Sequence, residues 1–141
     1  MISTEEFQKV APQKLDWLVE NGFKRAKDFE KSSPTVATLV YCGKNVAFEF
    51  SLDIRDQCIG AEVIKVKSGQ LLRNMDGGYS SDVFNHLVKY EGYRGNPRGE
   101  FTESESLNYT QLDAAIEGWI SLISTAGSNL LSDQPVTLDP S

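Results

Sequence analysis

The chain has 141 residues, of which 40% are hydrophobic and 24% are charged, and its net charge is −6. This length fits one domain, and the apolar content supplies a buried core and excludes wholesale disorder. The negative charge argues against nucleic acid or an anionic membrane as a direct partner, because cationic surfaces bind both. No apolar run approaches the roughly 20 residues of a membrane span, and the acidic start is unlike a signal peptide. We therefore expect a cytoplasmic protein.

The N-terminal residues predict an amphipathic helix that ends near Gly22. Ser3 and Glu6 have the spacing of a capping box, which marks the start of the helix. Pro12 lies inside the pattern and removes a backbone donor, so we expect a kink there or two short helices that meet there. The apolar residues at helical spacing are Phe7, Val10, Ala11, Leu15, Leu18 and Val19.

Strands follow this helix. Residues 45–54 alternate between apolar and polar side chains, which is typical of a half-buried strand. The turns on either side predict an antiparallel meander of residues 35–42, 45–54 and 57–67, which a short strand from Gln70 to Asn74 extends. The mixed pattern of residues 23–31 indicates an edge strand before the meander.

The two turns of the meander predict its register. A two-residue turn at residues 43–44 pairs Leu39 with Phe48. A second turn at residues 55–56 pairs Phe48 with Val63. Both turns place the apolar side chains on one face of the sheet, and that face needs a cover.

Helices in the second half of the chain supply this cover. A serine at position 80 or 81 can cap a helix that ends near Gly92. A second helix runs from a capping box at Thr110 to about Ala126, where Gly127 closes it.

These elements together predict an α+β fold, in which an antiparallel meander sheet carries an N-terminal helix and C-terminal helices on one face. Residues 1–131 form a single domain. Residues 132–141 contain two prolines and little apolar surface, so we expect a flexible acidic tail.

Cysteine and histidine usage argues against metal and nucleophilic chemistry. The predicted strands place Cys42 and Cys58 about 25 Å apart, at about 3.3 Å per residue, so they do not form a disulfide. This agrees with a reducing compartment. The sequence has no zinc-ligand spacing, no nucleotide-binding loop and no fixed companion for His86. We expect no cofactor, no metal and no enzymatic activity.

Among the charged groups, the carboxylates say most about a possible function. Residues 100–141 include seven acidic residues and no basic one. The predicted register puts Glu49 opposite Glu62, and Asp113 and Glu117 form a second like-charge pair on the last helix. Either these are solvated pairs separated by lysine or water, or they are held ready for a cation, a basic side chain of a partner, or acid–base chemistry.

The segment of residues 90–98 combines aromatic, basic and turn-forming residues directly before the acidic third of the chain. Tyrosine and arginine are enriched among the side chains that dominate binding energy at protein interfaces. An ordinary loop whose arginines pair with the following glutamates is an equal alternative. The residues concerned are Tyr93, Arg94, Arg98, Glu100, Glu103 and Glu105.

The order of features resembles small immunity proteins encoded beside bacterial polymorphic or contact-dependent growth inhibition toxins. The resemblance lies in the leading helix that ends in residues 18–23, the strand from Leu39 to Val46, the segment of residues 53–56, and the closing helices. It covers nearly the whole chain, but as a pattern, and it carries no residue roles because such proteins share no catalytic motif. It implies a cytoplasmic, non-enzymatic inhibitor that blocks one toxin domain, often a basic nuclease.

The residues themselves favour the same kind of function. An acidic domain without a catalytic motif suits the capture of a cationic protein, so we predict a toxin-neutralising protein with a basic partner. The alternatives are a small enzyme or ligand-binding domain that uses Glu49 and Glu62, and a structural subunit or adaptor. The candidate partner-binding residues are Glu49, Asp53, Glu62, Tyr93, Arg94, Arg98, Glu100, Glu103, Glu105, Asp113 and Glu117.

Overall fold

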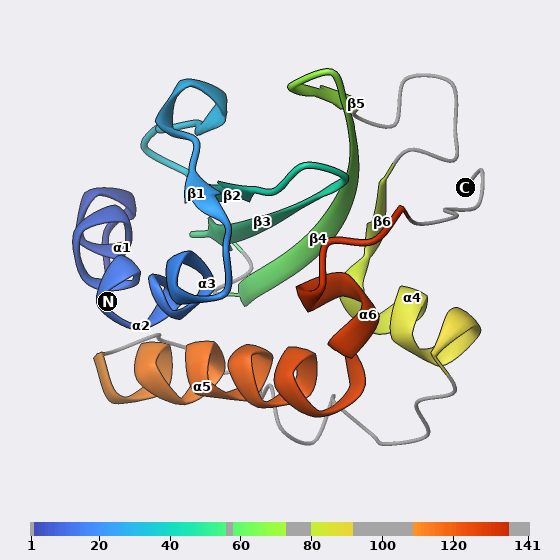
Figure 1. Cartoon of the computed structure of the whole chain (residues 1–141). Helices are drawn as coiled ribbons and strands as arrows, with labels where there is room; N and C mark the ends of the chain where they lie inside the picture. The colour runs from blue at the N-terminus through green and yellow to red at the C-terminus, as the bar shows by residue number, and fades with distance from the viewer. Residues whose placement is uncertain (1, 56–57, 73–79, 92–108, 136–141) are drawn as a thin grey trace.

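The computed structural model describes residues 2–55, 58–72, 80–91 and 109–135. An antiparallel, curled sheet lies at its centre, with short helices before it and a long helix after it, which confirms the predicted α+β fold (Figure 1). The strands follow the order β1-β2-β3-β4-β5, and β6 also pairs with β4. They are β1 (Lys24–Arg25), β2 (Val36–Cys42), β3 (Val46–Asp53), β4 (Cys58–Lys67), β5 (Gln70–Leu72) and β6 (Ser80–Asp82).

The predicted N-terminal helix is divided into three short helices, α1 (Thr4–Val10), α2 (Pro12–Leu15) and α3 (Trp17–Glu20). The capping box at its start is confirmed, since the Ser3 hydroxyl accepts the Glu6 N–H and the Glu6 carboxylate accepts the Ser3 N–H. Pro12 is the first residue of α2, where a missing N–H costs nothing. The break at Pro12 is therefore as predicted, and the second break, at Asp16, was not expected.

The register of the meander is confirmed in one hairpin and corrected in the other. Phe48 pairs with Val63 across β3 and β4, as predicted. Across β2 and β3, however, Leu39 pairs with Phe50 rather than with Phe48. The Gly43 N–H donates to the Val46 carbonyl oxygen, so the turn is centred on residues 44–45 rather than on residues 43–44. A turn that lies one residue later shifts the partners by two positions. A shift of two keeps every side chain on its predicted face.

Helices cover one face of this sheet, and the main core lies between them and that face. The covering helices of the second half are α4 (Val83–Tyr90), α5 (Tyr109–Ala126) and α6 (Ser128–Leu131), and Figure 1 shows α5 lying along the sheet. Phe48 and Phe23 meet edge to face in the core, with their ring centres 5.4 Å apart. Other buried members include Phe7, Leu15, Leu18, Leu39, Tyr41, Phe50, Leu52, Val63, Leu87, Leu112, Ile116, Trp119, Ile123 and Leu130.

The ends of the later helices differ in detail from the prediction. Asp82, and not Ser80 or Ser81, caps α4 by accepting the Asn85 N–H at 3.0 Å. Since α5 begins at Tyr109, Thr110 lies within the helix rather than at its cap. The predicted stop after Ala126 is confirmed, and a Cβ on Gly127 would lie 2.8 Å from the carbonyl oxygen of Ile123. The short helix α6 was not predicted.

The sheet face away from the helices carries a second, smaller cluster. Ala47, Ile64 and Val66 are buried there, and the partly buried Cys42 and Leu71 pack against them. Cys42 pairs with Ala47 near one end of β3 and Cys58 with Asp53 at the other, and neither cysteine is in a disulfide, as predicted.

The outer edge of β2 is closed largely by side chains. The sequence predicts an edge strand over residues 23–31, but β1 has only two residues, and a 3-10 turn, η1 (Lys27–Phe29), follows it. The turn brings Glu30 back to the sheet, where its carboxylate accepts the Val40 N–H at 3.0 Å. This side chain supplies a hydrogen bond that a longer strand would have made.

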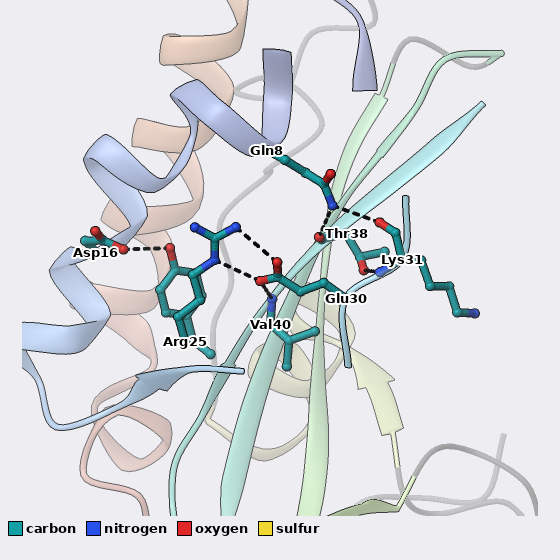
Figure 2. Close-up of polar contacts among 8 residues, drawn as sticks. Gln8, Asp16, Arg25, Glu30, Lys31, Thr38 and Val40 are labelled. Atoms are coloured by element: carbon teal, nitrogen blue, oxygen red, sulfur yellow. Dashed lines mark hydrogen bonds and ion pairs between the residues drawn. The ribbon is translucent and has the colours of Figure 1, made fainter. Parts of the chain in front are cut away.

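Arg25 and Gln8 complete this closed edge, as Figure 2 shows. The Arg25 guanidinium donates two hydrogen bonds of 3.0 Å to the two oxygens of Glu30, whose side chain is only 7% exposed. Gln8 Nε2 donates to the carbonyl oxygens of Lys31 and Thr38 at 2.9 and 3.0 Å. The backbone groups of β2 are thereby engaged and do not offer a template for another strand.

Tyr41 gives the protein a predicted weakness at alkaline pH. Its buried hydroxyl donates to Asp16 Oδ1 at 2.9 Å, and burial, this hydrogen bond and the Asp16 charge together raise the pKa of Tyr41 far above its usual value of about 10. The native state therefore keeps a proton that the unfolded chain loses above pH 10. Each further pH unit should then cost about 1.4 kcal/mol of stability, and nothing should be lost below pH 10.

The variant Tyr41→Phe isolates this effect because all other groups titrate equally in both proteins. We expect the wild-type free energy of unfolding to fall between pH 9 and pH 11 by about 1.4 kcal/mol more than that of the variant, as measured by urea unfolding. Equal losses in the two proteins would show that Tyr41 ionises normally in the fold.

Candidate functional site

Three carboxylates lie in a row across neighbouring strands on the sheet face away from the main core. Glu49 of β3 pairs directly with Glu62 of β4, as the sequence predicts, and Glu62 pairs on its other side with Asp82 of β6. Directly paired residues of antiparallel strands have Cβ atoms about 5 Å apart and share a face. We call Glu49, Glu62 and Asp82 the carboxylate row.

The members of the carboxylate row differ in their surroundings. Glu49 is 8% exposed and lies beside the buried Val40, whereas Glu62 is exposed. The Asp82 carboxylate is also the cap of α4. Like charges directly across a strand pair are unfavourable, and the burial of Glu49 adds a desolvation cost. Such an arrangement attracts ammonium or guanidinium groups.

In the described part of the chain, no group of three or more His, Cys, Asp and Glu side chains has an arrangement that could hold a metal ion. The buried His86 lies on α4. Burial lowers the pKa of its imidazole, and the charge of Glu91 offsets only part of this shift.

Asp53 shares the face of the carboxylate row but lies apart from it. It ends β3, four residues beyond Glu49, which corresponds to about 13 Å along a strand. Its Oδ1 accepts the N–H of Arg55 at 2.9 Å, which is a local turn contact.

The predicted pair on the last helix lies on a different side of the molecule. Asp113 and Glu117 are exposed on α5, which covers the opposite face of the sheet from Glu49. Lys14 of α2 bonds Glu117 Oε1 at 2.6 Å. This hydrogen bond, together with the charges of Glu117 and Asp113, raises the pKa of Lys14. For this pair, the interpretation as a lysine-separated surface pair fits the contacts, and the predicted site divides into two surfaces.

The remaining predicted site residues lie outside the described residues, as do the later residues of the predicted tail, 136–141. The site residues concerned are Tyr93, Arg94, Arg98, Glu100, Glu103 and Glu105.

Asp82 is the member of the carboxylate row that sequence reasoning missed. Its signal was present, since aspartate directly before an apolar helical run is as good an N-cap as serine. If the predicted N-cap is placed at Asp82 instead of Ser81, the helix begins at residue 83, and residues 80–82 are available for a strand that pairs with β4.

Comparison of the chain with protein-family models, with curated proteins and with solved structures finds no significant match. Among the described helices, none combines the length and the apolar character needed to span a membrane.

Proposed function

We propose that this chain is a binding protein that captures one basic protein partner, in the manner of an immunity protein that neutralises a toxin domain. The observation that carries the proposal is the carboxylate row of Glu49, Glu62 and Asp82. An arginine or lysine of a partner placed against this row could bond carboxylates from three neighbouring strands.

The distribution of charge along the chain supports the same proposal. The net charge is −6, and no basic residue occurs from residue 100 to the last residue. An acidic surface speeds the encounter with a basic protein, and this effect weakens as salt rises. The toxin part of the proposal rests on the resemblance of the sequence to immunity proteins.

Affinity capture with the tagged full-length chain, washed at low and then at high salt, identifies the partner. We expect one basic protein at near-equal stoichiometry. Its expression alone should arrest growth, and co-expression with this chain should restore growth. A captured partner that is harmless by itself would contradict the immunity function.

Charge reversal tests whether the carboxylate row is the docking surface. We expect Glu62→Lys to slow association with the captured partner by about tenfold, because repulsion replaces attraction at the exposed member of the row. Glu20→Lys, on the exposed side of α3, makes the same change in net charge away from the row and should slow association less than about twofold. Equal effects of the two variants, measured as association rates at low salt, would show that only net charge matters.

A small enzyme or ligand-binding domain is the second candidate, favoured by the unequal exposure of Glu49 and Glu62. Paired carboxylates in different environments can take different roles in acid–base chemistry. This candidate would replace the first if capture yields no partner and a ligand stabilises the native chain but not the Glu49→Gln/Glu62→Gln variant.

A further inference from the structure

A carboxylate near the C-terminus closes the turn between β2 and β3. Asp133 Oδ2 accepts the N–H of Lys44 at 2.5 Å, and Oδ1 accepts the N–H groups of Asn45 and Val46 at 2.8 and 3.0 Å. The side-chain amide of Asn45 donates in return to the Asp133 carbonyl oxygen at 2.8 Å. Successive backbone N–H groups that converge on one anion form a nest. Here the anion belongs to the same chain.

The backbone on both sides of this contact is adapted to it. Asp133 follows α6 and has a φ of 56°, a left-handed conformation in which helices usually end with glycine. Aspartate is strained there relative to glycine, and its carboxylate contacts offset that strain. On the other side, a Cβ at Gly43 would lie 2.6 Å from Asp133 Oδ2. The carboxylate fits because residue 43 has no side chain.

The thiol of Cys42 lies next to this contact, since it donates to the carbonyl oxygen of Gly43 at 3.3 Å. Its side chain is partly exposed, and burial together with the Asp133 charge raises the pKa of the thiol. Leu130, just before Asp133 in the chain, is fully buried in the main core. The carboxylate contact can therefore open at its exposed end while α6 stays anchored.

We propose that Asp133 is a latch, which fastens residues 132–135 to the β2–β3 turn and whose release opens the turn and uncovers Cys42 without unfolding the core. The contact joins residues 88 positions apart, so it adds a reversible closure between the two ends of the fold. Two of its bonds to backbone N–H groups go to the turn residues Lys44 and Asn45, and the third goes to Val46, the first residue of β3. The paired residues of β2 and β3, from Cys42 and Ala47 onward, make no bond to Asp133, so their hydrogen bonds remain when the latch opens.

Amide hydrogen exchange measures the latch directly. In the full chain, Asp133→Gly removes the carboxylate but suits the left-handed backbone, and Gly43→Ala expels the carboxylate without altering Asp133. Each variant should speed exchange of the Lys44 and Asn45 amides by about tenfold or more, with the Phe48 amide unchanged. The double variant should exchange no faster than the faster single variant, because both changes break one contact.

Alkylation of Cys42 by iodoacetamide, in a Cys58→Ser background, provides a second readout. Both latch variants should raise the alkylation rate, and low urea should not change that rate, since opening is local. Gln134→Gly loosens the same exposed segment without touching the turn and should leave exchange and alkylation as in the parent chain.

Three results would overturn the latch. They are unchanged exchange at Lys44 and Asn45, equal acceleration at Phe48 as in global unfolding, and a double variant whose acceleration is the product of the single ones.

Discussion

Replacing Glu30 with alanine is expected to lower the free energy of unfolding by about 3–5 kcal/mol. The Glu30 carboxylate accepts two hydrogen bonds from Arg25 and one from the Val40 N–H, and it is almost fully buried. Its removal leaves a guanidinium that is 24% exposed without its counter-charge and a strand N–H without an acceptor. Both losses carry the desolvation cost of the group left behind.

Urea unfolding of matched variants checks this expectation. Glu20→Ala removes an exposed carboxylate from α3 and should change stability by less than about 0.5 kcal/mol. The double variant Arg25→Met/Glu30→Ala should lose clearly less stability than the sum of the losses in the two single variants, because each single change leaves the other charged group without its partner. A Glu30→Ala protein within about 1 kcal/mol of the parent would show that Glu30 does not hold the edge of β2.

Replacing Trp119 with alanine should cost a similar amount, about 3–5 kcal/mol, by loosening α5 from the sheet. The indole ring is buried in the main core, and its N–H donates to the carbonyl oxygen of Ile59 at 3.0 Å. Within the described strands, residues 58–61 of β4 pair with β3 alone, because β6 begins its pairing at Glu62. Trp119 therefore both fills the core and satisfies an edge carbonyl of β4.

Two further variants separate the packing of Trp119 from its hydrogen bond. Trp119→Phe keeps most of the ring but leaves the Ile59 carbonyl oxygen without its donor, so we expect the free energy of unfolding to fall by about 1–2 kcal/mol. Ser121→Ala, on the exposed side of α5, should be neutral within about 0.5 kcal/mol. If Trp119→Ala and Trp119→Phe lose equal stability in urea unfolding, the ring contributes little and the assignment of α5 packing to Trp119 is wrong.

The sequence predicts the core faces of the sheet better than it predicts the strand partners. Alternation places Phe48 and Phe50 on the buried face whatever the turn length, and the face survives a shift of two residues. The turn at residues 43–46 depends on Asp133, which no local pattern connects to it. Reasoning from neighbouring residues therefore placed the turn at residues 43–44, which Gly43 alone would favour, one residue before its observed centre.

The candidate site was predictable only where it followed from register. Glu49 and Glu62 pair as predicted because the β3–β4 hairpin pairs as predicted. The edge of β2 was not predictable, since Glu30 acts as a hydrogen-bond acceptor for a strand N–H, and a mixed pattern of charges gives no sign of this. Side chains that replace backbone bonds leave no periodic signal.

The distance along the chain between the sheet and its helical cover affects folding during synthesis. Trp119 emerges 60 residues after Ile59, which at ribosomal rates corresponds to roughly 3–12 s. Hairpins form in microseconds, so the meander can pair long before α5 is made. For those seconds, only the N-terminal helices and, once it is made, α4 are available to cover its aromatic face. Chaperone binding to the nascent chain, or slow translation between the sheet and α5, would then govern how much protein reaches the folded state.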